Sequence, residues 1–362
     1  MSTPVNIEEY PIRIRAVWYD EFSKQLCWIN TLKLPHEEET ICSNDPERIA
    51  KAIIEMEIRG APAIGVAAAL GVAAFANRVL SERGSVYTMV SATIDRLWKT
   101  RPTAYNLFYA LGRLRSVLEN ARAQGYSPTD MVAAIEREAI SVWKEDIEAN
   151  LYIGLHGVEL IPEGARILTH CNAGALATSA YGTATAPIRI AFYKGKRIRV
   201  FATETRPVLQ GARLTVWELS REKIPVTLIT DNMAGYLMRK GLVDLVIVGA
   251  DRITREGYVV NKIGTYMLAL AAKRNNIPFY VAAPTSTIDP VSTIESVVIE
   301  ERDPREVKYV AGKLITVPEV PALNYAFDIT DPDLVTAIIT ERGVIKPPFE
   351  QNIPRVLAGG SS

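Results

Sequence analysis

From residue 165 onward, short apolar runs alternate with longer stretches of helical spacing, and this alternation constrains the fold more than any other feature of the chain. The apolar runs lie at 166–170, 198–202, 226–230, 245–249 and 278–282. Strands that are apolar on both faces, each followed by enough chain for a crossover helix, are typical of a parallel sheet covered on both sides. The sequence therefore predicts an α/β fold with a doubly wound, Rossmann-like parallel sheet.

The chain before this region has a different pattern, with two β-like segments at 12–18 and 25–30 flanking a polar turn. Helical patterns follow at 46–56, 62–80, 85–100, 104–125 and 130–156. We predict a smaller, mostly helical domain with a short antiparallel sheet over 1–129, a connecting helix over 130–156, and a Rossmann-like catalytic domain over 157–362. A length of 362 residues fits two domains.

Charge and cysteine content limit the classes of function. The chain has 41 basic and 41 acidic residues, so no net charge favours nucleic acid or an anionic membrane. The most apolar run, 61–76, is shorter than the roughly 20 residues of a membrane span. The cysteines, three in number, form no Cys/His cluster. We therefore expect no structural metal, no disulfide framework and a cytoplasmic, reducing location.

Polar residues follow each of the first four predicted strands. Cys171 follows the first, 203–206 the second, Asp231 the third and Asp251 the fourth. In an open α/β sheet, ligands bind at the carboxyl ends of the strands. These side chains are therefore expected to meet at one edge and to form the functional site.

Two of these residues could carry chemistry. Asp251 could simply cap a helix, but a carboxyl partly withdrawn from water has a raised pKa and can donate a proton near neutrality. Cys171 could be a small buried apolar residue, which is how we interpret Cys27 and Cys42. However, it lies at the junction of a strand and a predicted helix, and a helix N-terminus favours the thiolate. We expect neighbouring His170 to be structural.

Other segments could bind an anion or hydroxyls. Arg59, Gly60 and Ala61 precede a helix rich in small residues, where a cation and backbone N–H groups could hold phosphate, although a tight turn explains the same residues. Arg101 lies in a similar turn. The remaining candidates, each expected at a helix start after a strand, are Gln210, Asn261 and Lys262. No Gly-x-Gly-x-x-Gly or P-loop pattern follows a strand, so a nucleotide cofactor has no support.

At these residues the sequence resembles the 5-methylthioribose-1-phosphate isomerase family of methionine salvage. The most specific matches are Thr169-His-Cys-Asn-Ala-Gly-Ala-Leu-Ala-Thr178 and Gly249-Ala-Asp-Arg-Ile253. Further matches lie at 59–65, 101–107, 204–213, 231–234, 261–265 and 299–304. The resemblance covers nearly the whole chain.

The resemblance implies a cofactor-free aldose–ketose isomerase of a small sugar phosphate, usually a homodimer in this family. By position, Asp251 matches the proton donor and Cys171 the second catalytic group. The positions that match the family's substrate-binding residues are Arg59, Gly60, Ala61, Arg101, Gln210, Asn261 and Lys262.

Alternatives remain open at this point. Hydrogen could move between the first two sugar carbons by hydride shift or through an enolate with Cys171 as base. The substrate could instead be ribose 1,5-bisphosphate or 5-deoxyribose 1-phosphate. The same superfamily also contains non-catalytic regulatory subunits of a translation initiation exchange factor, although these as a rule lack the Cys171 and Asp251 pair.

Overall fold

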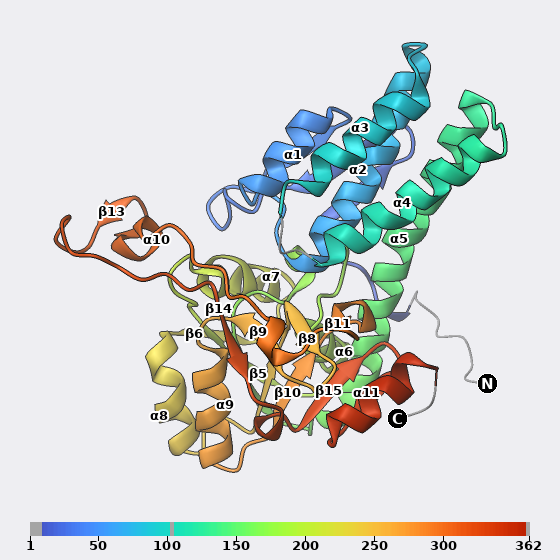
Figure 1. Cartoon of the computed structure of the whole chain (residues 1–362). Helices are drawn as coiled ribbons and strands as arrows, with labels where there is room; N and C mark the ends of the chain where they lie inside the picture. The colour runs from blue at the N-terminus through green and yellow to red at the C-terminus, as the bar shows by residue number, and fades with distance from the viewer. Residues whose placement is uncertain (1–8, 102–104, 360–362) are drawn as a thin grey trace. The chain divides into compact units, whose positions relative to one another are not determined.

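The computed structural model describes residues 9–101 and 105–359. The chain divides into two units, which are described separately: unit 1 holds residues up to Leu151 together with Gly174–Gly182, and unit 2 holds Tyr152–Ala173 and the chain from Thr183 onward. The predicted α/β class is confirmed, with a helical N-terminal part, a small antiparallel sheet and a larger, mostly parallel sheet (Figure 1).

Unit 1 begins with a three-stranded antiparallel sheet in the order β1 (Val17–Asp20), β2 (Gln25–Ile29) and β3 (Thr40–Ser43). The predicted hairpin is present, although its first strand starts later than expected. The register places Cys27 of β2 directly opposite Cys42 of β3, with Cα atoms 4.0 Å apart, and the two form a disulfide. Our expectation of no disulfide is therefore wrong. An odd cysteine count does not reveal a cross-strand pair, because only the strand register brings the two thiols together.

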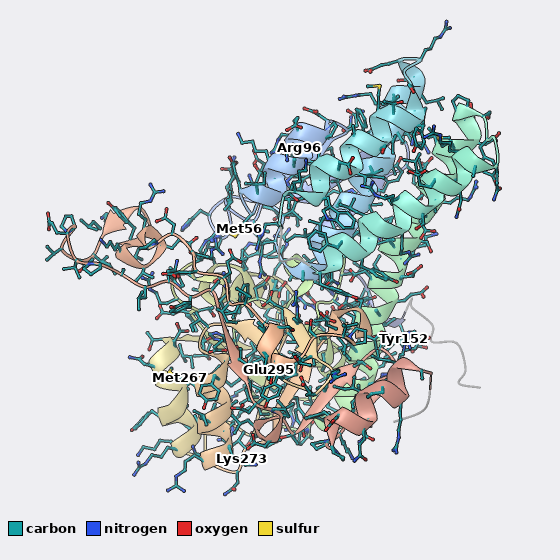
Figure 2. The ribbon with its side chains drawn as sticks, in the orientation of Figure 1. Met56, Arg96, Tyr152, Met267, Lys273 and Glu295 are labelled. Atoms are coloured by element: carbon teal, nitrogen blue, oxygen red, sulfur yellow. A yellow bond between two sulfur atoms is a disulfide. The ribbon has the colours of Figure 1, made fainter. Side chains whose placement is uncertain are left out.

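Helices make up the rest of unit 1: α1 (Pro46–Ile54), α2 (Ala61–Ser81), α3 (Val86–Trp98), α4 (Tyr105–Ala123) and most of α5 (Pro128–Gly157). The side chain of Asp45 caps α1 by accepting from the N–H of Glu47 over 3.2 Å. Arg96 of α3 donates to the carboxylate of Glu47 over 2.9 Å and so ties α3 to α1 (Figure 2). The predicted start of α4 at residue 104 lies outside the described residues.

α2 is the central helix of unit 1. α2 has 21 residues, and an 18-residue window within it has a mean hydropathy of 1.7, so it is long and apolar enough to span a membrane. However, 83% of that window is buried inside the protein. We had expected the apolar run to be too short for a membrane span, but α2 is long enough. The burial of α2 indicates that it is a core helix. Alanine and glycine on all sides let neighbouring elements pack closely around it.

Unit 2 contains a seven-stranded sheet in the order β16-β15-β10-β7-β4-β5-β6, parallel except for β16. Its strands are β4 (Arg166–Thr169), β5 (Arg199–Thr203), β6 (Val226–Ile229), β7 (Leu245–Val248), β10 (Phe279–Ala282), β15 (Ala337–Thr340) and β16 (Gly343–Ile345). The five predicted apolar runs supply β4, β5, β6, β7 and β10. The sequence did not predict β15 and β16.

A second, four-stranded sheet has the order β11 (Ile288–Asp289), β8 (Arg252–Thr254), β9 (Val259–Lys262) and β14 (Phe327–Thr330). The two short strands β12 (Tyr309–Val310) and β13 (Lys313–Leu314) pair with each other. The helices of unit 2 are α6 (Thr185–Tyr193), α7 (Val216–Arg221), α8 (Ala234–Arg239), α9 (Thr265–Arg274), α10 (Arg305–Lys308) and α11 (Phe349–Leu357).

Candidate functional site

The strand order of unit 2 defines where a ligand binds. From β4 the chain continues outward through β5 and β6, and then returns to place β7 on the other side of β4, followed by β10 and β15. The direction of winding therefore reverses between β4 and β7, and ligands of open α/β sheets bind at the carboxyl ends of the strands at such a switch point. Cys171 follows β4 and Asp251 follows β7.

The loops after β4 and β7 touch each other. A Cβ added to Gly249, just after β7, would lie 2.5 Å from the Cβ of Ala173 in the loop after β4. Only glycine permits so close an approach. Because Gly249 and Ala173 are each two residues from a candidate catalytic residue, the contact brings the loops of Asp251 and Cys171 together.

Cys171 is the free cysteine of the chain, and its side chain is buried with 7% exposure. Its backbone has a φ of 61°, in the left-handed region that non-glycine residues seldom adopt. The α-helix that we expected to begin beside the thiol is absent: a short 3-10 turn at Ala175–Ala177 follows, and α6 begins only at Thr185. The helix-terminus explanation for a reactive thiolate is therefore wrong.

Asp251 does not cap a helix. Its N–H donates to the carbonyl of Val260 over 2.9 Å, and the next residue begins β8, so Asp251 marks the entry to the hairpin of β8 and β9. This hairpin lies between β7 and α9 in the chain, where we had expected a helix. The side chain is half-buried beside the switch point.

Gln210 lies immediately before the π-helical turn Gly211–Thr215, close to the end of β5. The backbone approach there is tight, because a Cβ on Gly211 would lie 1.8 Å from the carbonyl oxygen of Thr203. Gln210 is buried, and no donor among the described residues reaches its Oε1 atom. A buried acceptor without a partner costs about 1–3 kcal/mol. A ligand hydroxyl could satisfy this oxygen.

Asn261 and Lys262 are the last residues of β9, not the first residues of a helix as we had expected. Both side chains are buried, and the helix α9 begins three residues after Lys262, at Thr265. The Asn261 amide donates to Thr265 Oγ1 over 3.0 Å, and Lys262 Nζ lies 4.6 Å from the ring centroid of Phe327. The turn thus places a cation and an amide beside the N-terminus of α9, a favourable place for an anion.

A carboxylate from β14 occupies the N-terminus of α9. Asp328 Oδ2 accepts from the N–H groups of Gly264 and Tyr266 over 2.7 and 3.1 Å. Burial raises the pKa of Asp328 to about 6, against these hydrogen bonds and the charge of Lys262. Sequence reasoning missed Asp328, because β14 is distant in the chain from β9.

His170 joins the end of β4 to both neighbouring loops. Its Nε2 lies 2.9 Å from the carbonyl oxygen of Ile263, which can only accept, so Nε2 carries the proton. Its Nδ1 then accepts from Thr203 Oγ1, 2.6 Å away. Burial lowers the pKa of His170 and favours this neutral form. These contacts agree with the structural role that we expected for His170.

Unit 1 contains the other predicted binding residues. Gly60 has a φ of 90°, and a Cβ there would lie 2.5 Å from backbone and side-chain atoms of Ala177. Gly60 is the N-terminal flank of α2, Ala61 is the first residue of that helix, and Arg59 is half-buried just before them. Arg101 is half-buried after α3, and the following residues of its motif, 102–103, lie outside the described part of the chain.

Two threonines support the Cys171 loop: Thr205 lies in the polar segment 203–206 that the sequence predicted at this edge, whereas Thr215 was not predicted. Cys171 N–H donates to Thr205 Oγ1 over 2.8 Å, and Thr215 Oγ1 donates to the Cys171 carbonyl over 2.5 Å. Asp231 accepts from the N–H groups of Thr205 and Arg206, both over 2.7 Å, so its role is to hold the loop after β5. Thr215 is the last residue of the π-helical turn and does not directly follow a strand, so the carboxyl-edge rule could not point to it.

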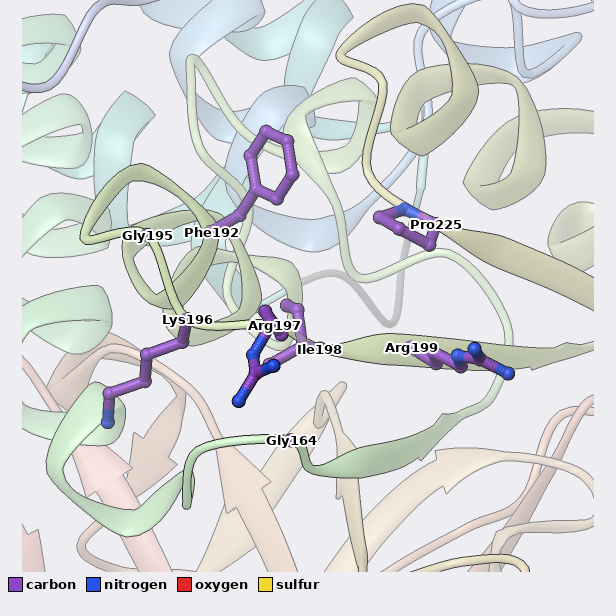
Figure 3. Close-up of a pocket in the computed structure, with 8 residues that line it drawn as sticks. All are labelled: Gly164, Phe192, Gly195, Lys196, Arg197, Ile198, Arg199 and Pro225. Carbon is purple, nitrogen blue, oxygen red and sulfur yellow. The ribbon is translucent and has the colours of Figure 1, made fainter.

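A surface hollow of about 580 Å³ lies at the opposite edge of the sheet (Figure 3). Gly164 precedes β4, Arg199 begins β5 and Pro225 precedes β6, so its walls belong to the amino ends of the strands. Lys196 donates to the carbonyls of Val158 and Ile161, and Arg197 pairs with Glu163 over 2.7 Å. Lys196 and Arg197 therefore already have partners, and the hollow lies away from the carboxyl ends of the strands, where Cys171 and Asp251 are found. Within residues 9–101 and 105–359, no three His, Cys, Asp or Glu side chains are close enough to hold a metal ion.

The doubly wound parallel sheet, with Cys171 and Asp251 following the two strands at its switch point, defines an α/β protein. Residues 57–347 match the model of the initiation factor 2 subunit family. The chain belongs to this family.

Relatives agree over almost the full length. The chain is 55% identical over 331 residues to the methylthioribose-1-phosphate isomerase of Thermotoga maritima, covering 90% of this chain and 93% of that protein. It is 51% identical over 336 residues to the enzyme of the same name from Desulforamulus reducens, covering 92% and 96%.

Solved structures are also similar. The 5-methylthioribose 1-phosphate isomerase of Pyrococcus horikoshii superposes with a TM-score of 0.92 at 41% identity, covering 99% of this chain and 100% of that one. A structure named translation initiation factor eIF-2B, subunit delta, from A. fulgidus has a TM-score of 0.85 at 45% identity, covering 95% and 99%.

Proposed function

We propose that this chain is an aldose–ketose isomerase, an intramolecular oxidoreductase that converts 5-methylthioribose 1-phosphate to 5-methylthioribulose 1-phosphate in methionine salvage. One observation carries the proposal: Cys171 and Asp251 follow the two strands at the switch point, in loops that Gly249 and Ala173 bring into contact. The full-length similarity to proteins named for this activity supports the same assignment.

The chemistry assigns a separate task to each group. Phosphate on the anomeric carbon prevents ordinary ring opening, so a proton must reach the ring oxygen as its bond to the first carbon breaks. Protonated Asp251 supplies this proton. Hydrogen then moves from the second carbon to the first while the second carbon forms the carbonyl and its hydroxyl loses a proton. Cys171 either removes the carbon-bound proton as a base or stabilises a direct hydride shift.

Substrate binding falls to residues that match the family's positions. In unit 2 we assign the phosphate and sugar hydroxyls to Asn261, Lys262 and Gln210, supported by the buried amide and cation of Asn261 and Lys262 and by the unsatisfied Gln210 Oε1 atom. From unit 1, the resemblance assigns substrate binding to Arg59, Gly60, Ala61 and Arg101.

Two substitutions test the catalytic pair. Asp251→Asn and Cys171→Ser should each lower kcat by about 100- to 10,000-fold, the usual contribution of a proton-transferring group. Exposed Asp333→Asn serves as the matched control and should keep wild-type turnover. Near-native turnover of both site variants, with thermal unfolding unchanged, would contradict the assignment.

The substrate is tested with 5-methylthio, 5-deoxy and 5-phospho forms of ribose 1-phosphate. The proposal expects the highest kcat/KM for the methylthio compound. A preference for the 5-phospho compound would identify a ribose-1,5-bisphosphate isomerase. Absence of turnover with all three would favour a non-catalytic regulatory subunit, a candidate that the similarity to the A. fulgidus structure keeps relevant.

We also propose that the protein is a homodimer. Several large apolar side chains of segment 297–325 are exposed, among them Val298 at 87% and Leu323 at 72%. On α9, Met267 is exposed as well (Figure 2). Exposed apolar groups in such numbers are typical of an interface, and a second copy of the chain is the occupant that we propose. Sedimentation equilibrium should give twice the chain mass, and Val298→Asp with Leu323→Asp should shift it toward the monomer.

A cytoplasmic location remains our proposal, although the Cys27–Cys42 disulfide removes the cysteine argument for it. The support is chemical: a sugar phosphate is charged and does not cross a bilayer unaided, so its isomerase belongs where the phosphate is added. Fractionation of the source cells would test the location. We propose neither nucleic acid nor membrane as a partner, on the strength of the balanced charge.

A further inference from the structure

The left-handed backbone of Cys171 is held from both sides by buried hydroxyl groups. Thr205 Oγ1 accepts from the Cys171 N–H over 2.8 Å, and Thr215 Oγ1 donates to the Cys171 carbonyl over 2.5 Å. Both threonines are buried. A non-glycine residue at φ of 61° is disfavoured by roughly 1 kcal/mol or more, so it persists only where its surroundings fix it.

A charged group further away fixes the orientation of the Asn172 amide, which hydrogen-bonds to Thr215. Glu218 is fully buried, and its Oε1 lies 3.1 Å from Asn172 Nδ2. A carboxylate can only accept, so Asn172 must present its NH₂ group on this side. The same Nδ2 lies 3.1 Å from Thr215 Oγ1, which therefore accepts there and must direct its own proton to the Cys171 carbonyl.

An ion-pair network anchors this series of hydrogen bonds. Arg189 is fully buried, with one guanidinium nitrogen 3.7 Å from Glu218 and its Nε 2.8 Å from Glu222. The cation keeps Glu218 ionised and so keeps it an acceptor. Thr215 itself is the last residue of the π-helical turn Gly211–Thr215, and such turns are frequent at functional sites.

We propose that Thr215, oriented by Asn172 and Glu218, is a positioning residue that fixes the direction of the Cys171 thiol. The catalytic use of the Cys171 thiol rests on the proposed function. The geometry that Thr215 imposes on the thiol does not. Thr215 acts through the backbone of Cys171, so its loss should change the rate of the chemical step more than substrate binding.

Three full-length variants test the proposal. Thr215→Val keeps the shape and removes the hydroxyl, and Thr215→Ser restores the hydroxyl. Thr330→Val is the matched control, because Thr330 is a fully buried threonine of β14 whose hydroxyl has no partner among the described residues. We expect Thr215→Val to lower kcat about 10- to 100-fold with KM within about twofold, as for a small misplacement of a reacting group. The serine variant and the control should stay within about twofold of wild type.

A second readout does not depend on turnover. Cys171 is the free thiol of this chain, so alkylation by iodoacetamide, followed by mass spectrometry, reports on it alone. The pH profile of the alkylation rate should shift in Thr215→Val and return toward wild type in Thr215→Ser. If Thr215→Val does not fold, Glu218→Gln provides the same test, because a glutamine can donate to Asn172, whose amide can then turn its oxygen toward Thr215 and draw the hydroxyl proton away from the Cys171 carbonyl.

The outcomes separate the two proposals. Wild-type alkylation and wild-type kcat in Thr215→Val would overturn the positioning role. If Cys171→Ser keeps its turnover, the proposed function fails instead, while the alkylation profiles still decide whether Thr215 sets the geometry of the thiol.

Discussion

Arg189 Nε donates to Glu222 Oε1 over 2.8 Å at a place in unit 2 where neither side chain reaches solvent. Arg189 also donates to Thr185 Oγ1, and Tyr193 donates to the other oxygen of Glu222 over 2.6 Å. A buried ion pair of this kind is costly to form, and the hydrogen bonds around it offset the loss of water. The ion pairs and hydrogen bonds of Arg189 therefore join α6 to α7.

Arg189→Met should therefore destabilise the protein by about 3–5 kcal/mol, because Glu218 and Glu222 would lose the cation that compensates their burial. Urea unfolding followed by circular dichroism measures the change. Arg197→Ala is the control, since the Arg197–Glu163 pair is exposed to solvent and its loss should leave the unfolding midpoint unchanged. Equal shifts of the unfolding midpoint in the two variants would show that burial does not determine how much an ion pair contributes to stability.

Gly211→Ala should destabilise the protein by about 3 kcal/mol or more, because the added methyl group would lie 1.8 Å from the carbonyl oxygen of Thr203 and the backbone would have to move. By contrast, Gly112→Ala in α4 meets no atom within 4 Å and should stabilise the helix by about 1 kcal/mol. Chemical unfolding of both variants checks the prediction. A much smaller loss of stability in Gly211→Ala would contradict the prediction and would mean that the π-helical turn can move away from the Thr203 carbonyl.

Asp328 should give the folded protein a dependence on pH between about 4 and 6. Burial raises the pKa of Asp328 to about 6, whereas an unfolded Asp titrates near 4. Below about pH 4 Asp328 is protonated in both the folded and the unfolded protein, so its burial has no electrostatic cost. Above about pH 6 folding carries the full cost of burying the ionised carboxylate. The stability contributed by Asp328 therefore falls as pH rises through this range.

The comparison of Asp328→Asn with wild type isolates this contribution. Its Tm relative to wild type should rise between about pH 4 and 6 and level off above, since asparagine does not titrate. Exposed Asp333→Asn corrects for a general loss of charge. A Tm difference that does not vary with pH would contradict the raised pKa of Asp328.

The Cys27–Cys42 disulfide predicts a definite thiol count. Denatured protein that has not been reduced should bind one equivalent of a thiol reagent per chain, and reduced protein three, because the sequence has three cysteines. Reduction should also lower stability by about 3 kcal/mol, the value for closing a loop of this size, since the two cysteines are 15 positions apart. Cys171→Ser should leave this effect of reduction intact. Three reactive thiols without reduction would disprove the bond.

The sequence allowed most of the parallel sheet to be predicted, because each of β4, β5, β6, β7 and β10 is a continuous apolar run of about the length of a strand. β9 and β15 were missed although all of their residues are buried. Other missed strands are short or half-buried: β8 has three residues, and β14 is only partly buried. Such segments have no periodicity that distinguishes them from loops. The hairpin of β8 and β9 was therefore mistaken for the start of a helix.

The candidate site was predictable in position but not in its internal contacts. The carboxyl-edge rule placed Cys171 and Asp251 at one edge of the sheet, because the carboxyl ends of parallel strands lie at the same edge; that β7 is the neighbour of β4 comes from the structure. The contacts that hold Cys171 come from residues 34 and 44 positions away, Thr205 and Thr215. The Cys27–Cys42 bond likewise depends on a strand register that local pattern does not reveal.

The hollow formed by Lys196, Arg197 and Arg199 offers a practical use for the far edge of the sheet (Figure 3). A strand of four or five residues spans roughly 13–17 Å, and the sheet keeps this edge apart from the loops that carry Cys171 and Asp251. The Arg197 side chain is 88% exposed and Cys171 only 7%, so in Arg197→Cys the new thiol would react first with a fluorophore or with a tether to a solid support. The protein could then be immobilised or observed one molecule at a time with its reactive loops left open to solution.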